Sequence, residues 1–180
     1  QMCIRDRASS ELFKVDLNGA ATKFKNAAIY TSTSFSPDGK YIMLTTIKRP
    51  YSYIVPLNRF PMESIVYDMN GQEIKKVNDV PLTEIMPKGF SSVRTGKRAM
   101  GWRDDLPSTL YFAQALDEGD QAKKVEYRDQ VFTWDAPFNS EPKPLAKTKD
   151  RYAGILWGDA THAFLYESWY DTRNQKTHLL

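Results

Sequence analysis

The sequence predicts an all-β fold, an incomplete β-propeller built from four-stranded antiparallel sheets. Three observations predict it: two kinds of hairpin signature alternate along the 180 residues, aromatic residues reach 13%, and long runs of helix-forming residues are scarce. Hydrophobic residues at 41% and charged residues at 26% are typical of a soluble globular domain rather than of a disordered chain.

The first hairpin signature is Asp-x-Asn-Gly, which occurs at residues 16–19 and again at 68–71. Asn-Gly supplies the two positive-φ positions of a type I′ turn, so each copy predicts a two-residue β-hairpin. The polar segments that follow, 20–24 and 72–77, are predicted to be outer strands at a sheet edge. A degenerate third copy is the apolar strand at 130–135, whose longer return contains proline.

The second signature is a turn that leads into a strongly β-prone strand. Ser36-Pro-Asp-Gly39 places Pro where the turn needs a fixed φ and Gly where it closes, and it predicts a strand over 41–47. Two counterparts are predicted as hairpins over 99–113 and 154–167. An aromatic residue stands just before each turn: Phe35, Trp102 and Trp157.

The two signatures alternate in a fixed order, inner pair and then outer pair, as a four-stranded propeller blade requires. The spacing predicts parts of about four blades, two of them whole, with approximate bounds 8–27, 28–79, 80–147 and 148–180. An ordinary β-sandwich is the main alternative. Residues 1–7 resemble a cloning or assembly scar, so they are set aside and the natural N-terminus is expected to be missing.

Charge and composition disfavour several classes of function. The net charge of +3 is spread over isolated basic pairs, which are interpreted as solvated strand edges and do not form the basic face of a nucleic-acid-binding protein. The single Cys3 excludes an internal disulfide and a Cys-rich zinc site. No stretch has the roughly 20 apolar residues that cross a bilayer. The isolated basic pairs that are interpreted as solvated strand edges are Lys48-Arg49, Lys75-Lys76, Lys97-Arg98 and Lys123-Lys124.

The chain shows no recognisable catalytic, phosphate-binding, metal or cofactor motif. Gly-x-Ser-x-Gly is absent, and the nearest segment, 89–93, is interpreted as a loop. His162 and His178 have no partners at metal-ligand spacing, and His162 is predicted to be a solvated residue beside a turn. The acidic pairs Asp104-Asp105 and Glu118-x-Asp120 are predicted to be turn and solubility residues.

One long connection stands out at residues 47–61, where a tight turn would suffice. Arg49, Tyr51, Tyr53 and Arg59 are the candidate substrate-binding residues there, because their cationic and aromatic groups suit a carboxylate or a peptide. A rigid, proline-braced loop that covers the blade edge is the alternative.

Three segments together resemble a known family: Phe-Ser-Pro-Asp-Gly-Lys-Tyr-Ile at 35–42, Arg-Pro-Tyr-Ser-Tyr-Ile-Val-Pro-Leu-Asn-Arg-Phe-Pro at 49–61, and Val-Tyr-Asp at 66–68. They are similar to the N-terminal propeller of prolyl oligopeptidase family serine peptidases, in the glutamyl endopeptidase-like branch. The second segment is the specific part, because the Ser-Pro-Asp-Gly turn is shared with many bacterial propellers. The similarity runs from about residue 9 to the end.

The resemblance implies a propeller that caps a C-terminal α/β-hydrolase domain, which is absent from this chain and carries the Ser, Asp and His of an acyl-serine mechanism. The propeller would filter and orient peptide substrates, with acidic side chains preferred at the cleaved position. A periplasmic or secreted location is favoured by the same resemblance. The alternatives are a non-enzymatic propeller that binds a protein partner and an isolated accessory β-domain.

Overall fold

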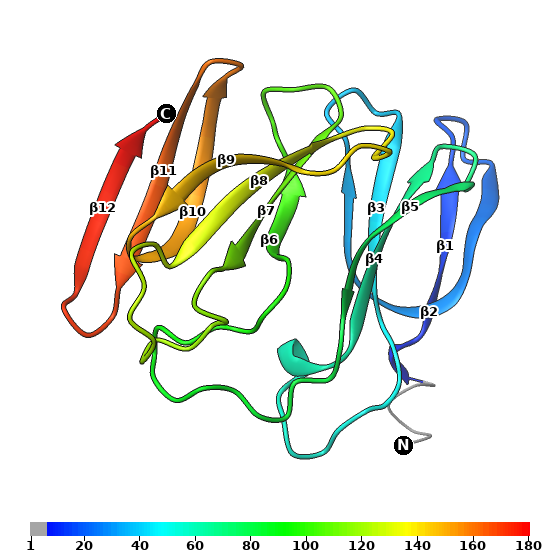
Figure 1. The fold of residues 1–180 in the computed structure, drawn as a ribbon. Coiled ribbons are helices and arrows are strands. Elements are labelled where there is room, and N and C mark those ends of the chain that lie inside the picture. Colours follow the sequence, from blue (N-terminus) through cyan, green and yellow to red (C-terminus); the bar gives the residue numbers. More distant parts are fainter. Residues whose placement is uncertain (1–6) are drawn as a thin grey trace. The chain divides into compact units, whose positions relative to one another are not determined.

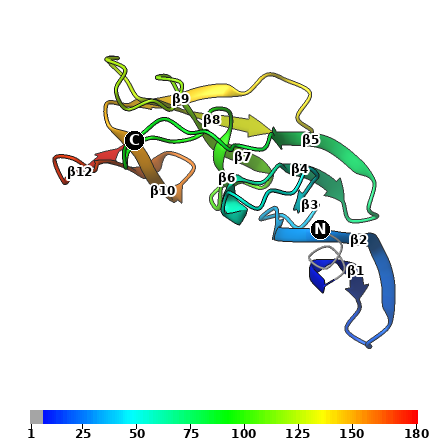
Figure 2. The same cartoon turned by 90° about the horizontal axis from the view of Figure 1, so that it is seen from below.

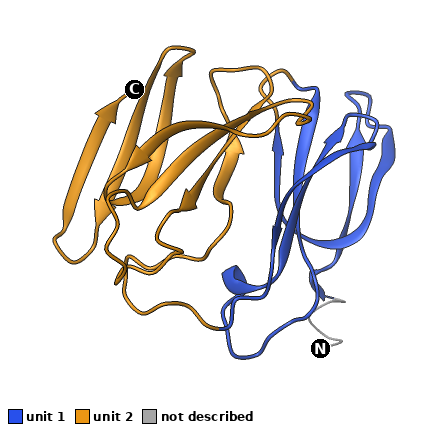
Figure 3. Cartoon of the chain, viewed as in Figure 1, with its two compact units in different colours: residues 1–35, 39–84 blue, residues 36–38, 85–180 orange. Residues whose placement is uncertain are grey.

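The computed structural model describes residues 7–180, and these fold almost entirely into antiparallel strands (Figure 1). The chain divides into two compact units (Figure 3). The first comprises the residues up to Phe35 together with 39–84, and the second comprises residues 36–38 together with 85–180. The predicted all-β, antiparallel character is therefore confirmed.

The first unit is a five-stranded sheet whose strands neighbour one another in chain order. The strands are β1 (Ser10–Val15), β2 (Ala21–Phe35), β3 (Tyr41–Ile47), β4 (Met62–Asp68) and β5 (Glu73–Val80). A short 3₁₀ turn, η1 (Leu57–Arg59), lies in the connection between β3 and β4. Figure 2 shows the strand order from below, with β1 at one end and β5 at the other.

The prediction that residues 20–24 form a separate edge strand is wrong. Residues 20–24 were expected to form an edge strand, but they lead into a strand of 15 residues that pairs with β1 over its first half and with β3 over its second. The reason is that neither Gly nor Pro interrupts the sequence between Lys25 and Phe35, so the strand continues. The corresponding prediction for 72–77 is confirmed, because β5 ends the strand order.

The two Asp-x-Asn-Gly segments form the same turn, but it is not the predicted type I′ turn. Gly19 and Gly71 have φ of +87° and +85°, whereas neither Asn is in the left-handed region. The Gly71 N–H donates to the Asp68 carbonyl at 3.0 Å, as Gly19 does to Asp16. Each is a type I turn closed by a left-handed glycine, a three-residue hairpin loop.

The Asp side chain explains this choice of turn. Asp68 Oδ1 accepts hydrogen bonds from the backbone N–H groups of Asn70 at 2.9 Å and Gln72 at 2.8 Å. Asp16 Oδ1 accepts the equivalent pair in the first copy. A short carboxylate that bonds to the backbone two residues on stabilises this geometry and keeps Asn70 right-handed.

Asp68→Ala is expected to destabilise the β4–β5 hairpin by about 1 kcal/mol, because two backbone donors lose their acceptor. Hydrogen exchange of the β4 and β5 amides should accelerate about fivefold. Asp68→Asn is the matched control, since it retains an acceptor oxygen and should change exchange less. Equal exchange in the two variants would contradict this account of the turn.

The core of the first unit centres on β3, whose predicted bounds of 41–47 are confirmed. Ile42, Met43 and Leu44 are all buried in sequence, so both faces of this strand are covered. Val66 of β4 and Val77 of β5 are 0% and 1% exposed. Side chains buried on both faces hold the strand at the centre of its sheet.

The second unit holds two sheets. One has the strand order β6 (Arg98–Trp102), β7 (Thr109–Ala115), β8 (Asp129–Asp135) and β9 (Lys143–Thr148), and the other has β10 (Arg151–Asp159), β11 (His162–Trp169) and β12 (Asn174–Leu179). The hairpins predicted over 99–113 and 154–167 are confirmed as β6–β7 and β10–β11. The strand predicted over 130–135 is confirmed as part of β8, and its proline-containing return is β9.

A shared core joins these two sheets. Ala113 and Val131 come from the four-stranded sheet, Tyr152 and Leu165 come from the three-stranded sheet, and none of the four is more than 7% exposed.

The interpretation of 89–93 as a loop is confirmed, because no strand covers residues 81–97. The four blade bounds stay predictions, and the suggested scar lies outside the described residues apart from Arg7.

Candidate functional site

The connection between β3 and β4, residues 48–61, is the long link that the sequence singled out (Figure 1). Its two ends extend the ladder of the strands, since the Lys48 N–H donates to the Pro61 carbonyl at 2.8 Å. The Thr83 N–H donates to the Arg59 carbonyl at 3.0 Å. The loop is therefore braced by backbone bonds, and it presents its side chains from a fixed frame.

The structure brings two of the four predicted binding residues together. The Arg49 guanidinium lies over the Tyr51 ring at 5.7 Å from its centroid. Tyr51 in turn stacks on Phe60 at 6.3 Å, and Phe60 is only 7% exposed. Tyr53 is 73% exposed, and Arg59 is half-buried in η1. A cation held against an anchored aromatic ring is the defined part of this candidate site.

Arg49 and Tyr51 both line a cavity of about 310 Å³, whereas Tyr53 and Arg59 do not. Polar side chains, Lys48 and Glu63, form part of its wall. The volume lies at the small end of the range for ligand pockets, large enough for one or two side chains. The apolar lining comes from Ala27, Ala28, Ile29 and Ile47.

The lysine beside Arg49 is already neutralised. Lys48 contacts Asp79 and lies 4.0 Å from Glu63, while Lys76 lies 3.2 Å from Glu63 and 3.4 Å from Asp79. The hydrogen bond from Lys48 is the main cause that holds the pKa of Asp79 below its usual value. These four groups balance in charge, so the positive charge available to a ligand in the cavity is that of Arg49.

A second candidate site lies in the second unit and rests on buried charges that the sequence reasoning missed. Asp117 and Asp129 are 1% and 0% exposed. Arg151 joins them: its Nη1 and Nη2 donate to Asp117 at 3.1 and 2.7 Å, and its Nη1 also donates to Asp129 at 3.0 Å. Bidentate pairs of this kind are the strongest of the charge-assisted bonds.

Two more arginines complete this group, which we call the arginine–aspartate cluster (Arg98, Arg128, Arg151, Asp117 and Asp129). Arg128 Nη1 donates to Asp117 at 3.0 Å, and Arg98 contacts Asp129. Burial raises the pKa of Asp117, but the hydrogen bonds from Arg151 and Arg128 outweigh it and hold the pKa below its usual value. The Asp117 carboxyl group is thus ionised in the interior, as its arginine partners require.

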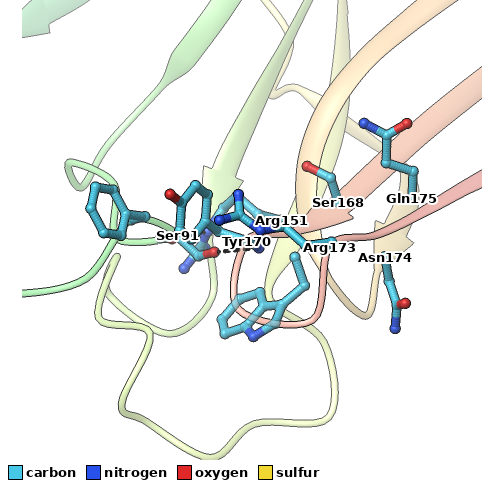
Figure 4. A pocket seen from close by; sticks show the side chains of 9 residues that line it. Ser91, Arg151, Ser168, Tyr170, Arg173, Asn174 and Gln175 are labelled. Atoms are coloured by element: carbon cyan, nitrogen blue, oxygen red, sulfur yellow. Dashed lines mark hydrogen bonds between the residues drawn. The ribbon is translucent and has the colours of Figure 1, made fainter.

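A pocket of about 390 Å³ opens beside the cluster (Figure 4). Ser91 stands at its edge: its carbonyl accepts from Arg151 Nε at 2.8 Å, and its hydroxyl accepts from the Tyr170 N–H at 3.1 Å. Tyr170 stacks on Phe90 at 4.3 Å between ring centroids, and the Arg173 guanidinium lies over the Tyr170 ring at 3.8 Å from its centroid. The pocket therefore has aromatic and cationic walls.

Comparison with curated proteins gives two relatives with the same name, "Probable glutamyl endopeptidase, chloroplastic". The rice protein is 44% identical over 172 residues and the Arabidopsis thaliana protein is 42% identical over 172 residues, in each case 94% of this chain. The chain belongs to the prolyl oligopeptidase family of peptidases. Its place in the glutamyl endopeptidase-like branch, expected from residues 49–61, is confirmed. It spans 18% of the length of each relative.

Solved structures support the fold of this peptidase segment. An acylaminoacyl peptidase from Pyrococcus horikoshii matches 94% of the chain with a TM-score of 0.57 at 15% identity, over 27% of its own length. An acylaminoacyl peptidase in complex with Z-Gly-Gly-Phe-chloromethyl ketone matches 97% of the chain with a TM-score of 0.56 at 14% identity, again over 27% of its length. The predicted partial propeller is confirmed. No family model matches the sequence.

No helix within residues 7–180 is long and apolar enough to cross a membrane. The names of both relatives include the word chloroplastic, so they do not support the periplasmic or secreted location that the resemblance favoured. Nor do His, Cys, Asp and Glu residues of the described part gather into a group that could hold a metal ion.

Two sequence expectations about charged residues of this peptidase segment are wrong. Lys97-Arg98 was expected at a solvated strand edge, but the Arg98 side chain is 12% exposed and contacts Asp129. Asp105 was expected to be a turn and solubility residue; it does lie in a turn, but its side chain is 2% exposed and accepts two hydrogen bonds from Arg103, at 3.0 and 2.6 Å. Tertiary folding brings Asp129 to Arg98, and the geometry of the turn brings Arg103 to Asp105. The pattern of charges along the sequence shows neither contact.

The histidines occupy structural positions in the peptidase segment. His162 is 62% exposed and its Nδ1 lies 3.0 Å from Asp159 Oδ1, which confirms the predicted solvated residue beside a turn. His178 Nε2 lies 3.1 Å from Oε1 of Glu167, a carboxyl group that is 2% exposed. Burial raises the pKa of Glu167, but hydrogen bonds from the Asp150 N–H and His178 hold it below its usual value.

Proposed function

We propose that this chain is the substrate-gating propeller portion of a serine-type peptidase that hydrolyses peptide bonds after glutamate. The match to proteins named glutamyl endopeptidase, at 44% identity over 94% of the chain, carries this proposal. The missing part of the enzyme would be the C-terminal α/β-hydrolase domain with its Ser, Asp and His. No catalysis is expected from residues 1–180 alone, and peptide is the proposed substrate.

The cavity beside β3 supports a role in choosing acidic substrates. Arg49 supplies its uncompensated positive charge, and Tyr51 holds the guanidinium against an aromatic face. A carboxylate that enters would receive charge-assisted hydrogen bonds from Arg49, while the aliphatic part of its side chain meets the apolar lining. A glutamine side chain of the same shape would gain only neutral hydrogen bonds.

Arg49→Ala in the complete peptidase is expected to lower the ratio of kcat/KM for a Glu peptide to that for the matched Gln peptide by about tenfold. The measurement compares two fluorogenic peptides that differ only in this residue. Arg59→Ala tests the second predicted arginine by the same ratio. A smaller change is expected for it, since Arg59 does not line the cavity.

Lys147→Ala is the matched control, because it removes a cation that lies over an aromatic ring, Tyr127, in the second unit at 5.4 Å. It should leave the Glu-to-Gln ratio unchanged. An unchanged ratio in both Arg49→Ala and Arg59→Ala would refute the proposed role of the 48–61 loop. Arg49→Lys should retain part of the preference, since it keeps the charge but loses the planar guanidinium.

A further inference from the structure

The pocket beside the arginine–aspartate cluster has an arginine in its wall whose charge the fold does not neutralise. Two arginines, Arg151 and Arg173, line this pocket of about 390 Å³, and no aspartate or glutamate does. Asp117 and Asp129 balance the charge of Arg151. Within residues 7–180 Arg173 forms no ion pair, and its guanidinium lies over the Tyr170 ring instead. The pocket therefore presents one positive charge that an anion could neutralise.

The backbone conformation of Arg173 is unusual for its residue type. Arg173 has φ of +57° in the turn between β11 and β12, where its N–H donates to the Tyr170 carbonyl at 3.2 Å. Glycine and asparagine adopt this left-handed conformation far more readily than arginine does. Residues held in such conformations are frequent at ligand-binding sites. What an arginine adds at this position is a guanidinium in the wall of the pocket.

Gln121 connects this turn to the loop that precedes β6. Its Oε1 accepts a hydrogen bond from the Ser91 N–H at 2.8 Å, and its Nε2 donates to Asp171 Oδ2 at 3.2 Å. The Ser91 hydroxyl in turn accepts from the Tyr170 N–H at 3.1 Å. The loop and the turn are thus held together before a ligand arrives, which reduces the conformational entropy lost on binding.

An exposed aromatic surface belongs to the same pocket. Phe90 stacks on Tyr170 with 4.3 Å between the ring centroids, yet Phe90 remains 80% exposed. Both rings line the pocket together with Arg173. Ser168 and Gln175, which are cross-strand neighbours on β11 and β12, add a hydroxyl and an amide to the lining (Figure 4). The pocket thus offers a planar apolar face, a cation and neutral hydrogen-bonding groups.

We propose that this pocket binds an acidic peptide, with a carboxylate on Arg173 and a neighbouring aromatic side chain against Phe90. The planar guanidinium presents paired N–H donors that match the two oxygens of a carboxylate. The exposed Phe90 ring suits an aromatic neighbour, because aromatic pairs gain more than the area that they bury. Peptide is the ligand class because the chain belongs to a peptidase family. The carboxylate comes either from an acidic side chain or from a peptide C-terminus.

The test titrates short peptides into the complete protein and measures hydrogen exchange of residues 168–175, a readout confined to this pocket. Acetyl-Phe-Glu-dimethylamide carries a side-chain carboxylate, and its tertiary amide resists hydrolysis. Acetyl-Phe-Gln-dimethylamide is its neutral match, and acetyl-Phe-Gln with a free C-terminus carries only a main-chain carboxylate. The carboxylate peptides should protect this segment at lower concentration than the neutral one. Arg173→Gln is expected to weaken binding of a carboxylate peptide about tenfold.

Three further variants separate the two parts of the ligand. Phe90→Ala should weaken binding of the acidic and neutral peptides alike, by about fivefold, because it removes the aromatic contact. Arg173→Lys should retain part of the preference for a carboxylate, since it keeps the charge but loses the planar guanidinium. Lys147→Gln is the matched control: it removes a cation that lies over the Tyr127 ring at 5.4 Å in the same unit but outside the pocket, and it should leave the titration unchanged.

The proposal is overturned if the carboxylate and neutral peptides protect residues 168–175 equally. It is also overturned if Arg173→Gln binds both carboxylate peptides as the unmodified protein does. Dependence of only the free-acid peptide on Arg173 would support the site and identify its ligand as a chain terminus. All the residues that line the pocket belong to the second unit, so these results do not bear on the Glu-to-Gln cleavage ratio, which tests the 48–61 loop separately.

Discussion

Replacing Arg151 with alanine is expected to destabilise the second unit by about 3–5 kcal/mol, because it leaves the buried carboxyl groups of Asp117 and Asp129 without their main partner. Arg151 makes hydrogen bonds to Asp117, Asp129 and the Ser91 carbonyl, and it is 6% exposed. Water does not reach these carboxylates to replace the lost guanidinium. The cost is that of unpaired buried charge rather than of one lost hydrogen bond.

Hydrogen exchange gives a local measurement of this effect in a protein with several folding units. The Tyr152 N–H is a suitable reporter, since it donates to Asp129 Oδ2 at 2.6 Å. Exchange in β10 should accelerate at least about 100-fold in Arg151→Ala. Arg173→Ala, which removes an exposed arginine of the same unit, should change it by less than about twofold. Equal exchange in the two variants would contradict the structural role of the cluster.

The same cluster gives a pH dependence whose sign follows from Asp117. Its pKa is held below the usual carboxyl value, so its contribution to stability is fully present above the unfolded-state pKa of about 4. The contribution is lost as pH falls through the lowered native pKa. Below that pH, Arg151→Ala and the unmodified protein should converge in β10 exchange once intrinsic rates are corrected for pH.

Gly119→Ala is the second substitution with a large expected effect. A Cβ at this position would lie 1.9 Å from the Val93 carbonyl oxygen, and that carbonyl belongs to backbone that cannot rotate away. Gly119 also has φ of +78°, which L side chains rarely adopt. The clash and the conformational strain together are expected to cost about 3–4 kcal/mol.

Gly96→Ala separates the two causes. Gly96 has almost the same φ, +79°, but the nearest atom to its added Cβ would be Arg94 Nη1 at 3.9 Å, an ordinary contact. It should therefore show only the conformational cost of about 1–2 kcal/mol. Exchange of the Val93 N–H, which donates to Gly119, should be at least about tenfold faster in Gly119→Ala than in Gly96→Ala. Equal rates would show that the close approach is relieved at little cost.

The sequence by itself determined the features that depend on near neighbours. Strand Tyr41–Ile47, the β6–β7 and β10–β11 hairpins and the positions of the Asp-x-Asn-Gly turns follow from alternation, β-propensity and turn residues within a few positions. The prominence of the 48–61 connection follows from its length and proline content. Its motif also indicated the peptidase family.

The tertiary structure decided which side chains meet. The turn type was mistaken because Asp68 bonds to backbone N–H groups that no dipeptide rule includes. Of the four residues predicted in the loop, only Arg49 and Tyr51 line the cavity, because the braced backbone directs each side chain separately. Sequence position shows where the loop is but not which way its residues point.

The arginine–aspartate cluster shows the same limit most clearly. Arg151 bonds to Asp117 and Asp129, which lie 34 and 22 residues away along the chain. In the sequence, charged residues next to apolar strands are equally typical of solvated strand ends. Only the packing of two sheets around Ala113, Val131, Tyr152 and Leu165 excludes water from these charges, and that exclusion makes their pairing obligatory.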